Sequence, residues 1–145
     1  FQRHPNSQGV FTKGKFPPFP VYAFKKVNDI GQFTDVDFHE VSALNPEILP
    51  IISIGDSYVE ALQVPNHQTY HGRLNDYMSQ NGKIVKSSAI ASGGNPLSQY
   101  LISAMFARKY LKNPNSIFVF SIISNPCPPK DSKITSPVCN NLLFK

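Results

Sequence analysis

Hydrophobic residues follow a regular order in the middle of the chain. Three short apolar runs, rich in β-branched and aromatic residues, predict buried strands. They cover residues 51–54, 83–90 and 117–123. Two longer segments between them, 68–80 and 97–111, have apolar residues at helical spacing and predict helices. We therefore expect the order strand, helix, strand, helix, strand, which is typical of a parallel sheet with right-handed crossovers.

The segments on either side of this core lack such a rhythm. Three prolines between residues 17 and 20 exclude a helix interior there, whereas residues 21–24 predict a short strand. Residues 33–41 alternate loosely and predict an edge strand. After Asn125, four prolines fall within twenty residues. We therefore expect three parts: an irregular lead-in with an edge strand (1–49), an α/β core (50–125) and a proline-rich irregular tail (126–145).

Composition and charge fit a folded domain and argue against a nucleic-acid partner. Hydrophobic residues make up 41% of the chain and charged residues 16%, an ordinary balance for a globular protein. The net charge is +5, but the basic excess is spread thinly, whereas nucleic-acid binding favours a concentrated basic stripe. No apolar stretch approaches the roughly 18 residues that a membrane span needs. We expect neither a nucleic-acid partner nor a transmembrane segment.

Three loops that follow the predicted strands contain residues suited to acyl transfer. In a parallel sheet, functional groups gather at the carboxyl ends of the strands. Ser57 offers a hydroxyl nucleophile, Gly93 allows a backbone N–H to approach closely, and Asn125 offers a side-chain amide. Acyl transfer needs a nucleophile and donors for the oxyanion. We therefore expect these three residues to converge in one catalytic site.

The same three loops resemble sequence blocks of the SGNH (GDSL-type) hydrolase family. Ile54-Gly55-Asp56-Ser57-Tyr58 is similar to the first block, and residues 88–95 are similar to the second, a Ser-Gly turn. Residues 121–125 resemble the third block, which normally ends in Asn-Asp, although Pro126 replaces the Asp here. The resemblance covers residues 50–125. It implies a flavodoxin-like three-layer α/β/α fold, one that would be incomplete at the C-terminus of this chain.

The resemblance also implies a function and the roles of the site residues. It implies a serine ester hydrolase for acyl or acetyl esters of lipids or carbohydrates, with Ser57 as the nucleophile. Ser57, Gly93 and Asn125 would donate to the oxyanion, and no cofactor or metal is expected. The resemblance slightly favours a secreted or cell-envelope location. The family's fourth block supplies an acid and a histidine as D-x-x-H, but no histidine follows His71. We therefore expect this chain to be a poor esterase and a longer form with that block to be a better one.

Other functions remain open on the sequence. A non-catalytic carbohydrate- or ligand-binding module on the same scaffold is the main alternative. An unrelated flavodoxin-like domain ranks last, because residues 55–60 lack the small and hydroxyl residues of a phosphate-binding loop. Ser57 can also serve as a simple helix cap, and Asp56 is expected to be a structural hydrogen-bonding residue. Cys127 and Cys139 either pair or remain free thiols.

The histidines have plain structural interpretations. His67 and His71 are four residues apart, a spacing that can hold a metal, but no H-E-x-x-H motif accompanies them. We expect them to lie on a surface helix. None of the four histidines is expected to serve Ser57. A small polar cluster is expected to be a solvated strand face; it comprises Asp35, Asp37, His39 and Glu40.

Overall fold

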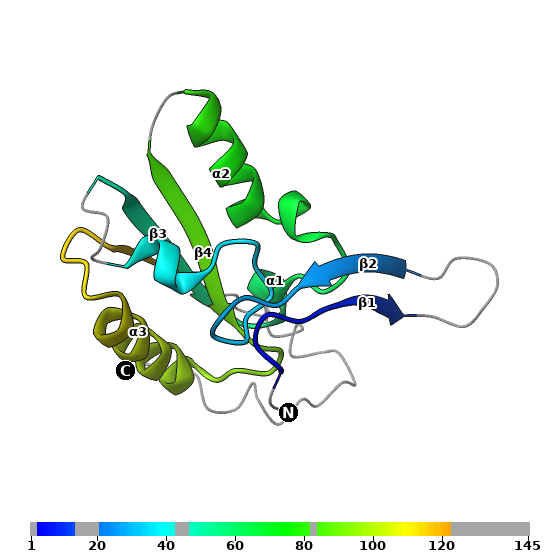
Figure 1. Cartoon of the computed structure of the whole chain (residues 1–145). Coiled ribbons are helices and arrows are strands. Elements are labelled where there is room, and N and C mark those ends of the chain that lie inside the picture. Colours follow the sequence, from blue (N-terminus) through cyan, green and yellow to red (C-terminus); the bar gives the residue numbers. More distant parts are fainter. Residues whose placement is uncertain (1–2, 14–20, 43–46, 82–83, 123–145) are drawn as a thin grey trace, which may run out of the picture.

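The computed structural model describes residues 3–13, 21–42, 47–81 and 84–122 (Figure 1). Strands alternate with helices from residue 49 onward, as the periodicity predicts. The strands are β1 (Gln8–Lys13), β2 (Val21–Lys26), β3 (Leu49–Gly55), β4 (Val85–Ala91) and β5 (Ile117–Phe120). The α-helices are α1 (Ser57–Glu60), α2 (Tyr70–Gln80) and α3 (Leu97–Leu111), and the 3-10 helices are η1 (Phe38–Val41) and η2 (Asn66–Gln68).

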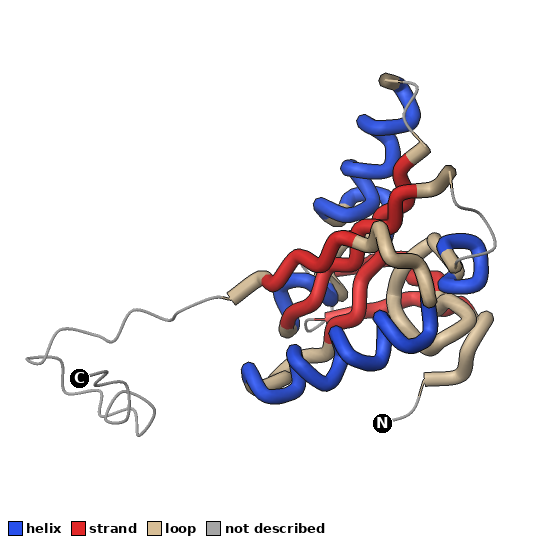
Figure 2. The backbone as a smooth tube through the Cα atoms, turned by 90° about the vertical axis from the view of Figure 1, so that its left-hand side faces the viewer, coloured by secondary structure: helices blue, strands red, loops and turns tan. Residues whose placement is uncertain are grey.

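The core is a parallel sheet in the order β4-β3-β5. The central strand β3 pairs with β4 and β5, so that Ile54 lies opposite both Ile90 and Phe120. Figures 1 and 2 show α2 and α3 on opposite sides of this sheet. The predicted parallel α/β fold with three layers is thereby confirmed.

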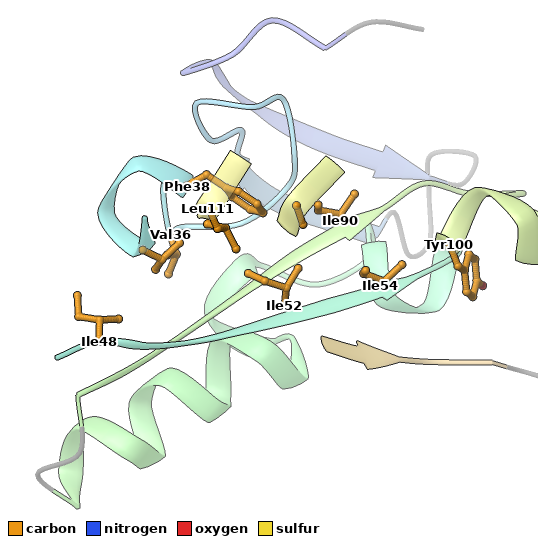
Figure 3. Packing of buried hydrophobic residues seen from close by; sticks show 10 residues of the cluster. Val36, Phe38, Ile48, Ile52, Ile54, Ile90, Tyr100 and Leu111 are labelled. Carbon is orange, nitrogen blue, oxygen red and sulfur yellow. The ribbon is translucent and has the colours of Figure 1, made fainter. Parts of the chain in front are cut away.

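The two faces of the sheet carry different residues. Ile52, Ile54 and Ile90 point to the α3 side and pack in one apolar cluster (Figure 3). The lead-in and α3 complete this cluster with Val36, Phe38, Val41, Ile48, Tyr100, Ala107 and Leu111. On the opposite side, Ala89 and Ala91 pack against Val59 of α1. Small side chains on this side allow the helices to approach the strands closely.

The lead-in differs from the prediction in two respects. β1 pairs antiparallel with β2, whereas only the second of these strands was predicted. Residues 33–41 form bends and the 3-10 helix η1, so the predicted edge strand there is wrong. The carboxylate of Asp29 accepts the backbone N–H groups of Phe38 (2.7 Å) and His39 (3.0 Å). These donors are therefore unavailable to a strand ladder, and the turn places Phe38 in the core.

Part of the apolar surface remains exposed on the described residues. Among the described strands β5 pairs only with β3, and its Ile117, Val119 and Phe120 are 39–45% exposed. The outer side of α3 is also apolar, and its exposed residues include Leu97, Leu101, Ile102, Met105 and Phe106. α3 nevertheless has only fifteen residues, and no helix in the described ranges is long and apolar enough to cross a bilayer.

His71 is buried, which corrects the expectation of a surface position. His67 lies exposed in η2, but His71 lies in the first turn of α2 and is 1% exposed. Thr69 separates the two histidines, because its side chain caps α2 by accepting the Gly72 N–H at 3.2 Å. Neither ring nitrogen of His71 makes a hydrogen bond of good geometry within the described residues.

Burial sets the charge state of His71 and of its neighbour Lys25. Burial, helped by the positive charge of Lys25, lowers the pKa of His71 to about 4, and the backbone of Phe33 only partly opposes this. Lys25 is 2% exposed, and its Nζ donates to the carbonyl of Ala61 at 2.8 Å. Burial lowers the pKa of Lys25 to about 8, against an opposing effect of Asp35.

The buried histidine makes stability sensitive to acid. Because its pKa is about 4 in the folded chain and about 6.5 when unfolded, unfolding takes up a proton between these pH values. We therefore predict that the free energy of unfolding falls as pH drops from 6.5 to 4, by about 3 kcal/mol from this residue. Urea denaturation at several pH values measures this, with His71→Leu expected to flatten the slope and the exposed-site control His67→Gln to retain it. Equal slopes in all three proteins would contradict the assignment.

Candidate active site

The turn at the end of β3 depends on the absence of a side chain at Gly55. A Cβ atom at this position would lie 2.3 Å from Val59 Cγ2 and 3.5 Å from the carbonyl oxygen of Ser121. Val59 is itself 1% exposed and anchors α1 to the sheet. The close contact between Gly55 and Val59 therefore lets α1 start two residues after the strand. It leaves Ser57 exposed at the carboxyl edge of the central strand.

Asp56 stabilises the start of α1. Its Oδ1 accepts the backbone N–H of Tyr58 at 3.0 Å, and its carbonyl accepts the N–H of Glu60 at 3.0 Å. This is the N-cap arrangement that short acidic side chains favour. Asp56 is thus a structural hydrogen-bonding residue, as predicted, and Ser57 occupies the first position of the helix rather than the cap.

Ser57 and Gly93 lie side by side, as the order of the strand ends predicts. A Cβ atom on Gly93 would lie 3.7 Å from Ser57 Cβ and 3.4 Å from Glu60 Oε2. The backbone N–H of Gly93, however, donates to Glu60 Oε2 at 2.9 Å. This donor was predicted to bind an oxyanion, and in the structure a carboxylate already occupies it. Gly93 therefore shares the site with Ser57, while its predicted role as a donor stays a prediction.

Glu60 is a site residue that the sequence interpretation missed. It follows Ser57 by three residues, so both lie on the same side of a helical turn. Its side chain is 4% exposed, and Oε1 forms an ion pair with the guanidinium of Arg3. The spacing from Ser57 is a signal in the sequence, but Arg3 lies 57 residues away and nothing in the local pattern links it to this site.

Asn125 lies outside the described residues, and so do Cys127 and Cys139. The chain that leads to Asn125 does begin at the site, because the Ser121 N–H donates to the Ile54 carbonyl at 2.9 Å. This bond extends the pairing of β5 with β3 to the strand end that precedes Ser57. The predicted amide donor at Asn125 stays a prediction.

The described residues do not identify a base for Ser57. His39 Nδ1 is 3.0 Å from Asp29 Oδ2, His71 is buried beside Lys25, and neither forms a hydrogen bond with Ser57 in the described part of the chain. In the described ranges, no group of three or more histidine, cysteine, aspartate or glutamate side chains is arranged to hold a metal ion. The arrangement offers an exposed hydroxyl beside a backbone turn, which suits the attack of an oxygen nucleophile on a small electrophile.

The tight turn gives a direct test of the site's architecture. Gly55→Ala would place its methyl group against Val59, so the helix or the strand end must shift. We predict a loss of about 1 to 3 kcal/mol in the free energy of unfolding, the usual cost of overpacking. Gly9→Ala is the matched control, because nothing lies within 4 Å of a Cβ there, and we expect little change. Chemical denaturation of both variants measures the difference, and equal stability would refute this account of the turn.

Comparisons with protein-family models, with curated proteins and with solved structures found no match to this chain. The residues at the carboxyl edge of β3 and β4, with the contacts that hold them, are therefore the basis for assigning a function to this chain.

Proposed function

We propose that this chain carries the nucleophile half of a serine ester hydrolase, with Ser57 attacking an acyl or acetyl ester of a lipid or carbohydrate. One observation carries the proposal: Ser57 is exposed at the end of the central strand, and Gly93 from the neighbouring strand end packs against it. The resemblance of the three strand-end loops to SGNH hydrolases supports the same assignment.

The local geometry favours acyl transfer for a physical reason. A serine hydroxyl needs an exposed position, where an ester carbonyl can approach without contact with neighbouring side chains. Gly93 has no side chain, so no Cβ atom stands 3.7 Å from Ser57 Cβ on that side. The nearby Tyr58 is 66% exposed, and its ring offers an apolar surface to an acyl group or a sugar ring.

A ligand-binding module without catalysis is the second candidate. One specific observation favours it, because the N–H of Gly93 already donates to Glu60. An oxyanion would then depend on other donors. On this scaffold the exposed surface at Gly93 and Ser57 would bind a carbohydrate or another small polar ligand, and Ser57 would donate a hydrogen bond to it.

Hydrolysis of p-nitrophenyl acetate separates the two candidates. For an enzyme, we predict turnover that depends on Ser57 and is lost in Ser57→Ala, while Ser79→Ala, an exposed serine of α2, retains it. Added imidazole supplies a base, so it should raise the rate of the unmodified chain above that of Ser57→Ala under the same conditions. Without an efficient base, the enhancement over water is expected to be no more than about 10³- to 10⁴-fold.

A fluorophosphonate probe gives an independent readout of the nucleophile. Mass spectrometry of the intact chain should show one adduct that is absent from Ser57→Ala and present in Ser79→Ala. Identical hydrolysis and labelling by the unmodified chain and Ser57→Ala, with and without imidazole, would refute the hydrolase proposal and favour the binding module.

A further inference from the structure

Three residues from remote parts of the chain meet beside Ser57. Arg3 precedes β1, Glu60 is the last residue of α1, and Gly93 follows β4. The Oε2 atom of Glu60 accepts the Gly93 N–H at 2.9 Å, and its Oε1 atom is paired with Arg3. Both carboxylate oxygens are therefore used, and the side chain is held from two directions.

We propose that Glu60 is a positioning residue, which fixes the loop at Gly93 against Ser57, and that Arg3 is the counter-charge that keeps this carboxylate in place. The inference rests on the proposed function of Ser57. In this proposal Gly93 contributes to the site by having no side chain beside the nucleophile, while its N–H donates to Glu60.

Burial explains why the carboxylate needs a counter-charge. Glu60 is 4% exposed, and a buried carboxylate without a cation would be strongly unfavourable. Once paired, it is a strong acceptor, because hydrogen bonds to an ionised group are about twice as strong as those between neutral groups. A strong acceptor matters at Gly93, since this residue is exposed and side-chain packing cannot fix its position.

The position of Arg3 is set by the lead-in and not by the active-site loop. Its guanidinium lies 4.3 Å from the centre of the Phe33 ring, a cation–π contact. Its Nη1 also lies 3.5 Å from the carbonyl oxygen of Gly31. These contacts hold the Arg3 guanidinium in place independently of residues 92–95. The partner of the Glu60 carboxylate therefore does not move with the loop.

Among the described residues, the loop at 92–95 makes few other hydrogen bonds. Within it, the Asn95 N–H donates to the Ser92 carbonyl at 3.2 Å, which closes the turn without tying it to α1. The bond from Gly93 to Glu60 links the turn itself to the helix that carries Ser57, whereas the packing of Val59 reaches only Ala91 before the turn. A shift of about 1 Å near a reacting group can cost about 100-fold in rate, so loss of this link should reach the chemistry.

The amide signal of Gly93 tests the link without any assay of activity. In nitrogen-15 NMR spectra of the whole chain, we expect Glu60→Ala to move this signal and to speed its exchange with solvent. Glu60→Gln keeps an oxygen acceptor but a weaker, neutral one, and should preserve part of the protection. Glu40→Ala is the control, because Glu40 is a partly exposed carboxylate paired with Lys86. An unchanged Gly93 signal and exchange rate in Glu60→Ala would overturn the proposal.

Turnover of p-nitrophenyl acetate tests the consequence for the nucleophile. We expect Glu60→Ala to lower the Ser57-dependent kcat about 10- to 100-fold with a smaller change in KM, and Glu60→Gln, a weaker acceptor, to restore part of it. If Glu60→Ala does not fold, Glu60→Gln decides: retained turnover supports positioning by an acceptor, and a loss as large as in Ser57→Ala overturns it. If the unmodified chain shows no Ser57-dependent turnover, the proposed function fails, and the NMR result alone decides whether Glu60 fixes Gly93.

Discussion

The carboxyl edge of the sheet is organised by the contact between Gly55 and Val59. This contact leaves no room for a Cβ atom, so the chain passes from the central strand into α1 within two residues. Val59, a buried residue of α1, packs against Ala89 and Ala91 of β4. Ser57 is consequently turned outward, and Glu60, three residues later, is turned toward the loop that follows β4. A single backbone constraint thereby places both the candidate nucleophile and the residue that positions its neighbour.

The lead-in supplies both cations that hold this short helix in place. Lys25 donates to the carbonyl of Ala61, just beyond the end of α1, and Arg3 pairs with the carboxylate of Glu60. The ring of Phe33 lies 4.3 Å from the Arg3 guanidinium and 6.0 Å from Lys25 Nζ. The lead-in therefore does more than cover the core. Its Arg3 and Lys25 place positive charge beside a four-residue helix that has few stabilising contacts of its own.

The predicted helices and strands agree best with the observed ones where the sequence signals for their limits and buried positions are clear. The helix predicted over 97–111 matches α3 at both ends, since Pro96 precedes it and Asn113-Pro114 follows it, and these residues mark the limits of a helix in the sequence. The helix predicted over 68–80 begins two residues later, as α2, because Thr69 caps it and residue 68 belongs to η2. β1 escaped prediction because its side chains are mostly exposed, so burial left no periodic signal in its sequence.

The sequence predicted only those parts of the candidate site that directly follow a predicted strand. Ser57 and Gly93 each follow a predicted buried strand, and parallel pairing of those strands is sufficient to bring them together. The partnership of Arg3 with Glu60 depends on how the lead-in folds back over α1. That path is determined by interactions such as the bonds from Phe38 and His39 to Asp29, which hydrophobic periodicity does not record.

The two faces of the sheet thus contribute differently to the molecule. On the α3 side, isoleucines and aromatic residues exclude water and supply the non-directional free energy of folding. On the α1 side, small residues and paired buried charges supply direction, since a hydrogen bond or an ion pair fixes distance and angle where apolar packing does not. A change on the α3 side should therefore act mainly on stability. A change at Glu60 or Arg3 should act on the geometry beside Ser57, even where the sheet remains folded.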